Sequence, residues 1–395
     1  MHKLSRGSRV LIWRFALMAC VGFGPSLQAS DDAMAAIDFP TFHASWENDT
    51  RTISRGAAPS DRFYTNGVRV ALTWAPADDQ SPFHGWAHAL LSRMPFNASE
   101  ASPNAMANGY GYAIGQNMYT PSRIDRPDPD PRDRPYAGWL YAGVLQTHVR
   151  FSGEGDIVRN IVHRRSIVTA RSVEFDLGMI GPASGAAESQ KWVHSHLCEC
   201  IQPQGWGTQL KNELGAHAGY DWSTRRAQWY RLGRSGDRRA ERERLFDLTT
   251  SVGASVGNIF TNGRAGGVAR LGWNLPDELA PDANIRSFDP GGEPAFPVSA
   301  YGYVRGEGRA VLRNVFLDGN LFRAGPRVDH QPMVADCEYG FVIELFSLRG
   351  SWRRVLRSPE FVGQAGSQAY GVLNLSWNLA QTVHDVRRAL GGKRS

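Results

Sequence analysis

The chain has 395 residues, of which 21% are charged, and a formal net charge of +6. Four basic and no acidic residues lie within the first thirty, so most of the positive charge belongs to this segment and does not indicate a nucleic-acid partner. After residue 30 no run of about twenty apolar residues occurs, which excludes a transmembrane helix. The remaining length suffices for one large closed β architecture or two ordinary domains.

Residues 1–30 have the features of a signal peptide. An apolar stretch at 10–23 is followed by Ala29, a small residue suited to cleavage. A fatty acid on Cys20 is the alternative, but Met18 suits a lipoprotein signal poorly, and plain export is favoured. The basic residues that precede or interrupt the apolar stretch are Lys3, Arg6, Arg9 and Arg14.

Period-two alternation predicts the fold class. In residues 68–74 one face carries Val, Leu and Trp, and the other carries Arg69, Ala71 and Thr73. Residues 373–379 repeat the pattern, with no charge on the face that bears Leu and Trp. This lipid-out, lumen-in pattern is typical of a transmembrane antiparallel β-barrel. We predict an all-β barrel of about 12 strands at 41–50, 63–75, 110–119, 137–151, 164–180, 207–223, 246–258, 265–274, 297–313, 335–347, 350–357 and 367–379.

The predicted barrel occupies residues 31–380 and is followed by a basic tail, 381–395. Residues 121–135 contain five prolines and residues 275–296 are rich in Pro, Asp and Gly, so both segments are predicted loops. One short helix is expected in a loop after Gly181-Pro182. Ser184 can cap this helix, which would run to about His196.

Three short motifs carry candidate chemistry. They are Glu47-Asn48-Asp49, the stretch 61–67 with sequence DRFYTNG, and the stretch 190–194 with sequence QKWVH. A carboxylate, a glycine-containing strand able to expose its backbone, and a histidine are the parts that bind a hard cation and activate water. Strict alternation sends Asn48 and Asp49 to opposite faces, so both serve one site only if the strand ends or is bulged there.

Each motif alone also has a plain structural interpretation. Asn48 and Asp49 can simply terminate a strand, and His194 can be a solvated helix residue. The whole set, which includes stretches 116–121, 133–138, 178–182 and 203–213, resembles the outer-membrane lipid A 3'-O-deacylase family. The resemblance is dense from about residue 45 to residue 215 and rests mainly on strand pattern beyond that.

The resemblance implies a twelve-stranded barrel in the bacterial outer membrane with a calcium-dependent site between the wall and a loop helix. By position, Asp49 would bind Ca²⁺ through its carboxylate, and Thr65 and Gly67 would bind it largely through backbone oxygens. A further acidic ligand belongs shortly after the histidine. Glu199 is the nearest candidate, although its spacing is one residue short.

The catalytic roles follow from the same resemblance. His194 would be the general base, and Gln190, one helical turn away, would orient the histidine or the substrate. Asn48 would support the metal site. Arg126 falls where the family places a basic residue and suits a lipid A phosphate. The implied reaction removes a 3'-linked acyloxyacyl chain from lipid A, the lipid anchor of lipopolysaccharide.

The stretch 194–200, with sequence HSHLCEC, raises a competing metal hypothesis. In an extended segment its two histidines and two cysteines would lie on one side and suit zinc. Thiols of exported proteins usually pair, however, so a disulfide is favoured. Cys198 or Cys200 would bond to the other or to Cys337, and such a disulfide would staple the helix.

Two other functions use the same strands. One is a non-catalytic barrel, either a small-solute pore or a structural protein, and the other is a calcium-dependent outer-membrane phospholipase. The expected partners are lipid A and the lipids of the outer membrane, without nucleic acid.

Overall fold

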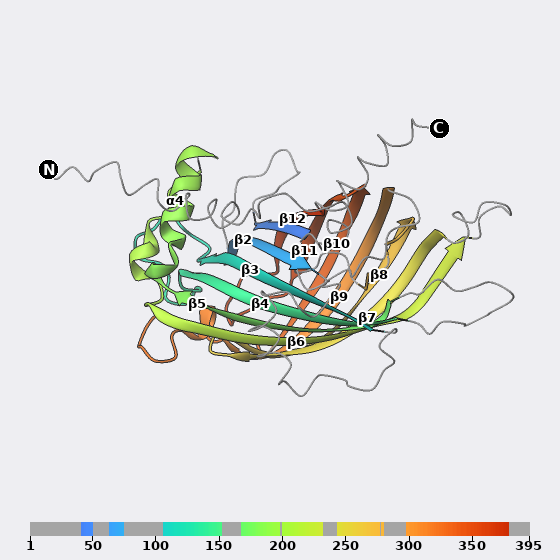
Figure 1. Ribbon diagram of the computed structural model, residues 1–395. Helices are drawn as coiled ribbons and strands as arrows, with labels where there is room; N and C mark the ends of the chain where they lie inside the picture. Colours follow the sequence, from blue (N-terminus) through green and yellow to red (C-terminus); the bar gives the residue numbers. More distant parts are fainter. Residues whose placement is uncertain are drawn as a thin grey trace, which may run out of the picture. The chain divides into compact units, whose positions relative to one another are not determined.

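A computed structural model describes residues 41–49, 63–74, 106–151, 167–197, 200–231, 243–276, 278–279 and 298–378. Twelve antiparallel strands form a closed barrel (Figure 1), which confirms the predicted fold class and strand number. The strands are β1 Thr41–Asn48, β2 Phe63–Trp74, β3 Met106–Thr120, β4 Ala137–Phe151, β5 Ile167–Ile180, β6 Glu213–Arg231, β7 Glu243–Gly257, β8 Phe260–Trp273, β9 Val298–Asn314, β10 Met333–Leu345, β11 Leu348–Arg357 and β12 Gln368–Asn378.

The barrel closes through β1, which pairs with both β2 and β12. Thr41 lies opposite Asn378 on one side and opposite Thr73 on the other. Closure matters because an open sheet edge would leave backbone N–H and C=O groups without partners in hydrocarbon. None of the helices within the described residues has the length and apolarity needed to cross a membrane.

The predicted alternation is present in the wall. On β2, Ala71 and Thr73 are buried on the inner side, whereas Val68 is exposed on the outer side. The outer surface is apolar over most of the sheet, as expected for a surface that contacts lipid and not water. Its exposed side chains include Ile114, Leu140, Leu177, Leu214, Val252, Leu271, Val304, Phe341, Leu375 and Trp377.

At the end of the barrel where β1, β3 and β5 end, the connections are folded. This helix-bearing end carries α4 (Ala186–His196), a 3₁₀ turn at Gly205–Thr208 and α5 (Val315–Asp318). The prediction that strand six begins at residue 207 is wrong, because the chain forms the 3₁₀ turn there and enters β6 only at Glu213.

Aromatic side chains and α5 fill the lumen at the helix-bearing end. Phe316 of α5 is fully buried and stacks on Tyr119, with ring centroids 4.0 Å apart. Tyr64 packs edge-on against Tyr370, with ring centroids 5.1 Å apart. These residues form one buried cluster with Trp139.

The segment after β8 enters the lumen from the other end. Glu278 is buried, and its carboxylate accepts hydrogen bonds from Arg270 and Tyr301. This segment belongs to the predicted loop 275–296, most of which lies outside the described residues, as do the predicted signal peptide and basic tail.

Candidate functional site

One row of paired residues leads across the outer face of the wall to helix α4. Asn48 pairs with Asn66, Asn66 with Met118, and Met118 with Gly138. Met118 packs in a buried cluster with Ala186 and Ala187 of α4. The preceding row, Glu47, Gly67, Asn117 and Trp139, lines the lumen. The strand register therefore places Asn48 and α4 on the same side of the wall.

Helix α4 is seated closely on β4 because Gly138 has no side chain. A Cβ at this position would collide with the Ser184 hydroxyl and the Ala186 methyl group. Gln116 of β3 also donates to the Ser184 carbonyl at 2.7 Å. The predicted helix is confirmed, but the predicted cap is wrong. Gly185 is the N-cap, at φ 68°, and the Ser184 hydroxyl instead donates back to the Gly181 carbonyl at 2.6 Å.

The residues predicted to hold calcium lie where the strand geometry is broken. Strand β1 ends at Asn48, and Asp49 follows it as a buried residue. In β2 the pairing register shifts between Tyr64 and Asn66, so Thr65 is the extra residue of a bulge. The end of β1 and the bulge in β2 both interrupt the strict alternation of faces, so neighbouring residues there can serve one site. A bulged residue also leaves its backbone groups outside the regular ladder, which suits a metal that binds carbonyl oxygen.

His194 is buried on α4, and its Nδ1 lies 2.6 Å from the carbonyl oxygen of Ile201. A carbonyl only accepts hydrogen bonds, so Nδ1 must carry the proton. In the neutral ring Nε2 is then the basic nitrogen, which is the form that a general base requires. After α4 the chain turns back, so that the Ile201 carbonyl lies beside the His194 ring. This contact selects the tautomer.

Gln190 is also buried, one turn before His194 on the same face of α4. Its side-chain oxygen accepts a hydrogen bond of 2.7 Å from the indole N–H of Trp206. Trp206 lies in the 3₁₀ turn and packs against Tyr136, with ring centroids 4.9 Å apart. Sequence reasoning did not single out Trp206, although it belongs to the stretch 203–213 that supported the family resemblance.

Arg126 lies exposed in the loop between β3 and β4. The other exposed arginines of this loop pair locally, Arg123 with Asp125 at 2.8 Å and Arg132 with Asp130 at 3.0 Å. The Arg132 guanidinium and backbone N–H lower the pKa of Asp130 to about 2. Among the described residues Arg126 forms no ion pair, so its charge remains available to an external anion.

A buried ion pair fixes the base of this loop. Arg134 is fully buried, lies 4.7 Å above the Tyr119 ring and contacts Glu360 at 3.3 Å. Burial alone would raise the pKa of Glu360, but the guanidinium groups of Arg357 and Arg134 hold it below its ordinary value. The pair connects the β3–β4 loop to the β11–β12 loop. The pair gives the arginine in the stretch 133–138 a structural role that the motif alone does not indicate.

The structure decides between the cysteine alternatives. Cys200 is disulfide-bonded and Cys337 is a free, exposed thiol, so pairing with Cys337 is wrong. The zinc hypothesis needs an extended segment with free thiolates. Instead the chain is helical to His196, and the Cys200 sulfur is already bonded. Glu199, Cys198 and Cys20 lie outside the described residues.

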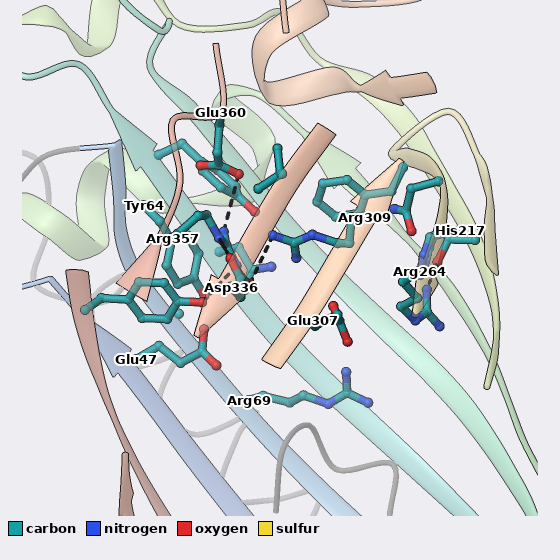
Figure 2. A pocket seen from close by; sticks show the side chains of 18 of the residues that line it. Glu47, Tyr64, Arg69, His217, Arg264, Glu307, Arg309, Asp336, Arg357 and Glu360 are labelled. Carbon is teal, nitrogen blue, oxygen red and sulfur yellow. Dashed lines mark hydrogen bonds and ion pairs between the residues drawn. The ribbon is translucent and has the colours of Figure 1, made fainter. Parts of the chain in front are cut away.

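A second polar region is a cavity of about 250 Å³ in the lumen. Figure 2 shows carboxylates and guanidinium groups facing one another across it. Arg357 pairs with Asp336 at 2.9 Å and Arg69 pairs with Glu174. His217 contacts Asp176 at 3.2 Å and is the lumen's counterpart of His194. Many charged side chains of this cavity pair with one another, so we place the candidate active site at α4.

A closed antiparallel barrel with an apolar outer surface and a charged lumen defines a bacterial outer-membrane protein. The chain belongs to the LpxR family, because the family model described as "Outer membrane protein LpxR" matches residues 12–379. This match confirms the family that the motifs indicated. No curated protein sequence matches the chain significantly.

Among solved structures, LpxR from Salmonella typhimurium is 18% identical to the chain and superposes with a TM-score of 0.62. The match covers 85% of this chain and 99% of that one, and it shows a shared fold. The β domain of the Bordetella autotransporter BrkA matches at 10% identity with a TM-score of 0.37, covering 87% and 99% of the two chains.

Proposed function

We propose that the protein is a calcium-dependent lipid A 3'-O-deacylase, which hydrolyses the ester that links the acyloxyacyl chain to the 3' position. The observation that carries this proposal is His194. It is a buried imidazole, held in the tautomer of a base, on a helix packed against the lipid-facing side of an outer-membrane wall. A lipid ester lying along this wall would approach the helix from the membrane.

The residues present suit a calcium ion. Asp49 supplies a buried carboxylate directly after β1, and the bulge at Thr65 frees backbone oxygen on the neighbouring strand. Gly67, two residues further on, and Glu199 would complete the proposed ligands, with Asn48 beside them in a supporting role. Oxygen donors of this kind are those that Ca²⁺ prefers. When bound, the ion would polarise the ester carbonyl and stabilise the charge that develops on its oxygen.

The chain's own residues account for the proton transfers. His194 Nε2 takes a proton from water, and the resulting hydroxide attacks the ester carbonyl carbon. The bond between the acyl carbon and the 3' oxygen breaks, and the imidazolium gives the proton to the departing 3' oxygen. The products are a free acyloxyacyl acid and lipid A with a 3' hydroxyl group. Gln190 orients the reacting groups from the same helix face.

Arg126 gives the proposed site a preference for a phosphorylated glycolipid. Its guanidinium, on the loop that packs beside the 3₁₀ turn, can form bidentate hydrogen bonds to a lipid A phosphate. A calcium-dependent phospholipase would act on the same membrane and remains the alternative that the experiment must separate.

The test compares cells that contain the wild-type protein, the His194→Ala variant or neither protein. Mass spectrometry of extracted lipid A should show loss of the 3' acyloxyacyl chain only with the wild type. Lysophospholipid without altered lipid A would replace this proposal with the phospholipase. No lipid product from wild-type protein recovered in the outer membrane would favour the non-catalytic barrel.

A further inference from the structure

Trp206 approaches α4 from a turn that is held firmly in place. The Gln204 backbone N–H donates to the Ile124 carbonyl at 2.8 Å, and Tyr136 donates to the same carbonyl at 3.3 Å. Gly205 packs against the Tyr136 ring so closely that a Cβ there would collide with it. The Trp206 indole is consequently buried in a fixed position between the β3–β4 loop and the helix.

This indole determines which end of the Gln190 carboxamide is available. The indole nitrogen is only a donor, so the group that it contacts at 2.7 Å must be the carboxamide oxygen. The NH₂ group of Gln190 therefore points away from Trp206. That nitrogen is buried and has no hydrogen-bond partner among the described residues. A buried donor left unsatisfied is costly, so this group is suited to a partner that the substrate supplies.

We propose that Trp206 is a positioning residue, which fixes Gln190 so that its NH₂ group donates to the ester carbonyl oxygen of the substrate. This inference rests on the proposed ester hydrolysis and adds a specific donor and its support. The donor would strengthen its hydrogen bond as negative charge develops on the carbonyl oxygen, beside the base one helical turn away. No alternative carboxamide orientation keeps the bond to the indole.

The kinetic test uses full-length protein in detergent micelles with purified lipid A and Ca²⁺. Trp206→Phe keeps an aromatic ring against Tyr136 but removes the N–H. It should lower kcat about tenfold, the scale of one lost hydrogen bond, and change KM less than about twofold. Gln190→Ala should lower kcat by about 10². The control is Trp192→Phe on the exposed part of the same helix, which should match the wild type.

The double variant tests whether Trp206 acts through Gln190. In the Gln190→Ala background, Trp206→Phe should cause no further loss of kcat, because the residue to be positioned is absent. Two independent, multiplying losses would overturn the inference and leave Trp206 with a packing role. Unchanged kcat in Trp206→Phe alone would overturn it as well.

A measurement without turnover separates this inference from the proposed function. The indole N–H resonance of ¹⁵N-labelled Trp206, assigned by its absence in Trp206→Phe, should be protected from exchange and should shift in Gln190→Ala. An unshifted resonance would overturn the inference whatever the activity. A shifted resonance in a protein that deacylates no lipid would retain the contact but contradict both the hydrolysis and the donor role that depends on it.

Discussion

Inside the barrel, Arg270 lies between the carboxylates of Asp247 and Glu278, whereas outside the wall Gln190 is held by one hydrogen bond from Trp206. Both groups are buried. In the lumen, oppositely charged side chains of different strands pair with one another. At α4, His194 and Gln190 are each oriented by a hydrogen bond with a chain segment that follows the helix.

This difference separates stability from activity. Variants in the lumen should weaken the barrel while the folded fraction keeps its activity, because their partners are other wall residues. Variants at α4 should remove activity while the barrel persists, since a helix in a loop contributes little to the wall. The predictions below test this separation, from the largest expected effect to the smallest.

Calcium removal should abolish activity. A calcium-selective chelator should remove deacylation, and added Ca²⁺ but not Zn²⁺ should restore it, because the proposed donors are hard oxygens. Asp49→Ala should mimic the chelator. Glu47→Gln is the matched control, since Glu47 lies two residues earlier and lines the lumen. Full activity of Asp49→Ala in the presence of chelator would contradict the metal site.

The two buried histidines should behave in opposite ways. His194→Ala should lower kcat by about 10² or more, the scale of general-base loss, while the unheated protein still migrates as a folded barrel. His217→Ala, on the lumen side, should leave kcat unchanged. If the two variants lose activity equally, the active site is not confined to α4.

Arg270→Met should destabilise the barrel by about 3–5 kcal/mol, because it leaves Asp247 and Glu278 buried without their counter-charge. Urea unfolding in micelles measures this change, and deacylation by the folded fraction should stay at the wild-type level. A large loss of kcat in folded protein would show that the lumen communicates with the site.

Arg126→Ala should raise KM for lipid A about tenfold with little change in kcat, as expected for one charge-assisted contact to a phosphate. Arg132→Ala provides the control, since Arg132 is already paired with Asp130. Substrate lacking the phosphate should make the wild type resemble the Arg126→Ala variant. Equal effects of the two substitutions would indicate only a general loop charge.

The smallest effect concerns acid stability. The pKa of Glu360 is lowered by Arg357 and Arg134 in the folded state, so its contribution is fully present above the ordinary carboxyl pKa. That contribution is lost as the pH falls through the lower, folded value. The urea concentration at the unfolding midpoint should therefore fall more steeply with decreasing pH for the wild type than for Glu360→Gln. Parallel curves would contradict a stabilising pair.

The sequence alone determined the twelve strands, the faces they present and the short helix, because a strand's alternation and a helix start are local properties. The sequence did not determine where those elements begin and end, and β6 begins six residues later than predicted. The prediction that Ser184 caps the helix was equally local, but Gly185 is the N-cap and the Ser184 hydroxyl donates to the Gly181 carbonyl.

The tertiary structure decided which polar groups meet. Ile201 orients His194 and Trp206 orients Gln190, both through chain segments that return to α4 after it ends. Arg134 and Glu360 are 226 positions apart along the chain. Motifs predicted the residue types that chemistry needs, but neither spacing nor composition predicts hydrogen bonds between distant loops. Barrel closure brings those loops together at one rim, so only the fold fixes the tautomer and the carboxamide orientation.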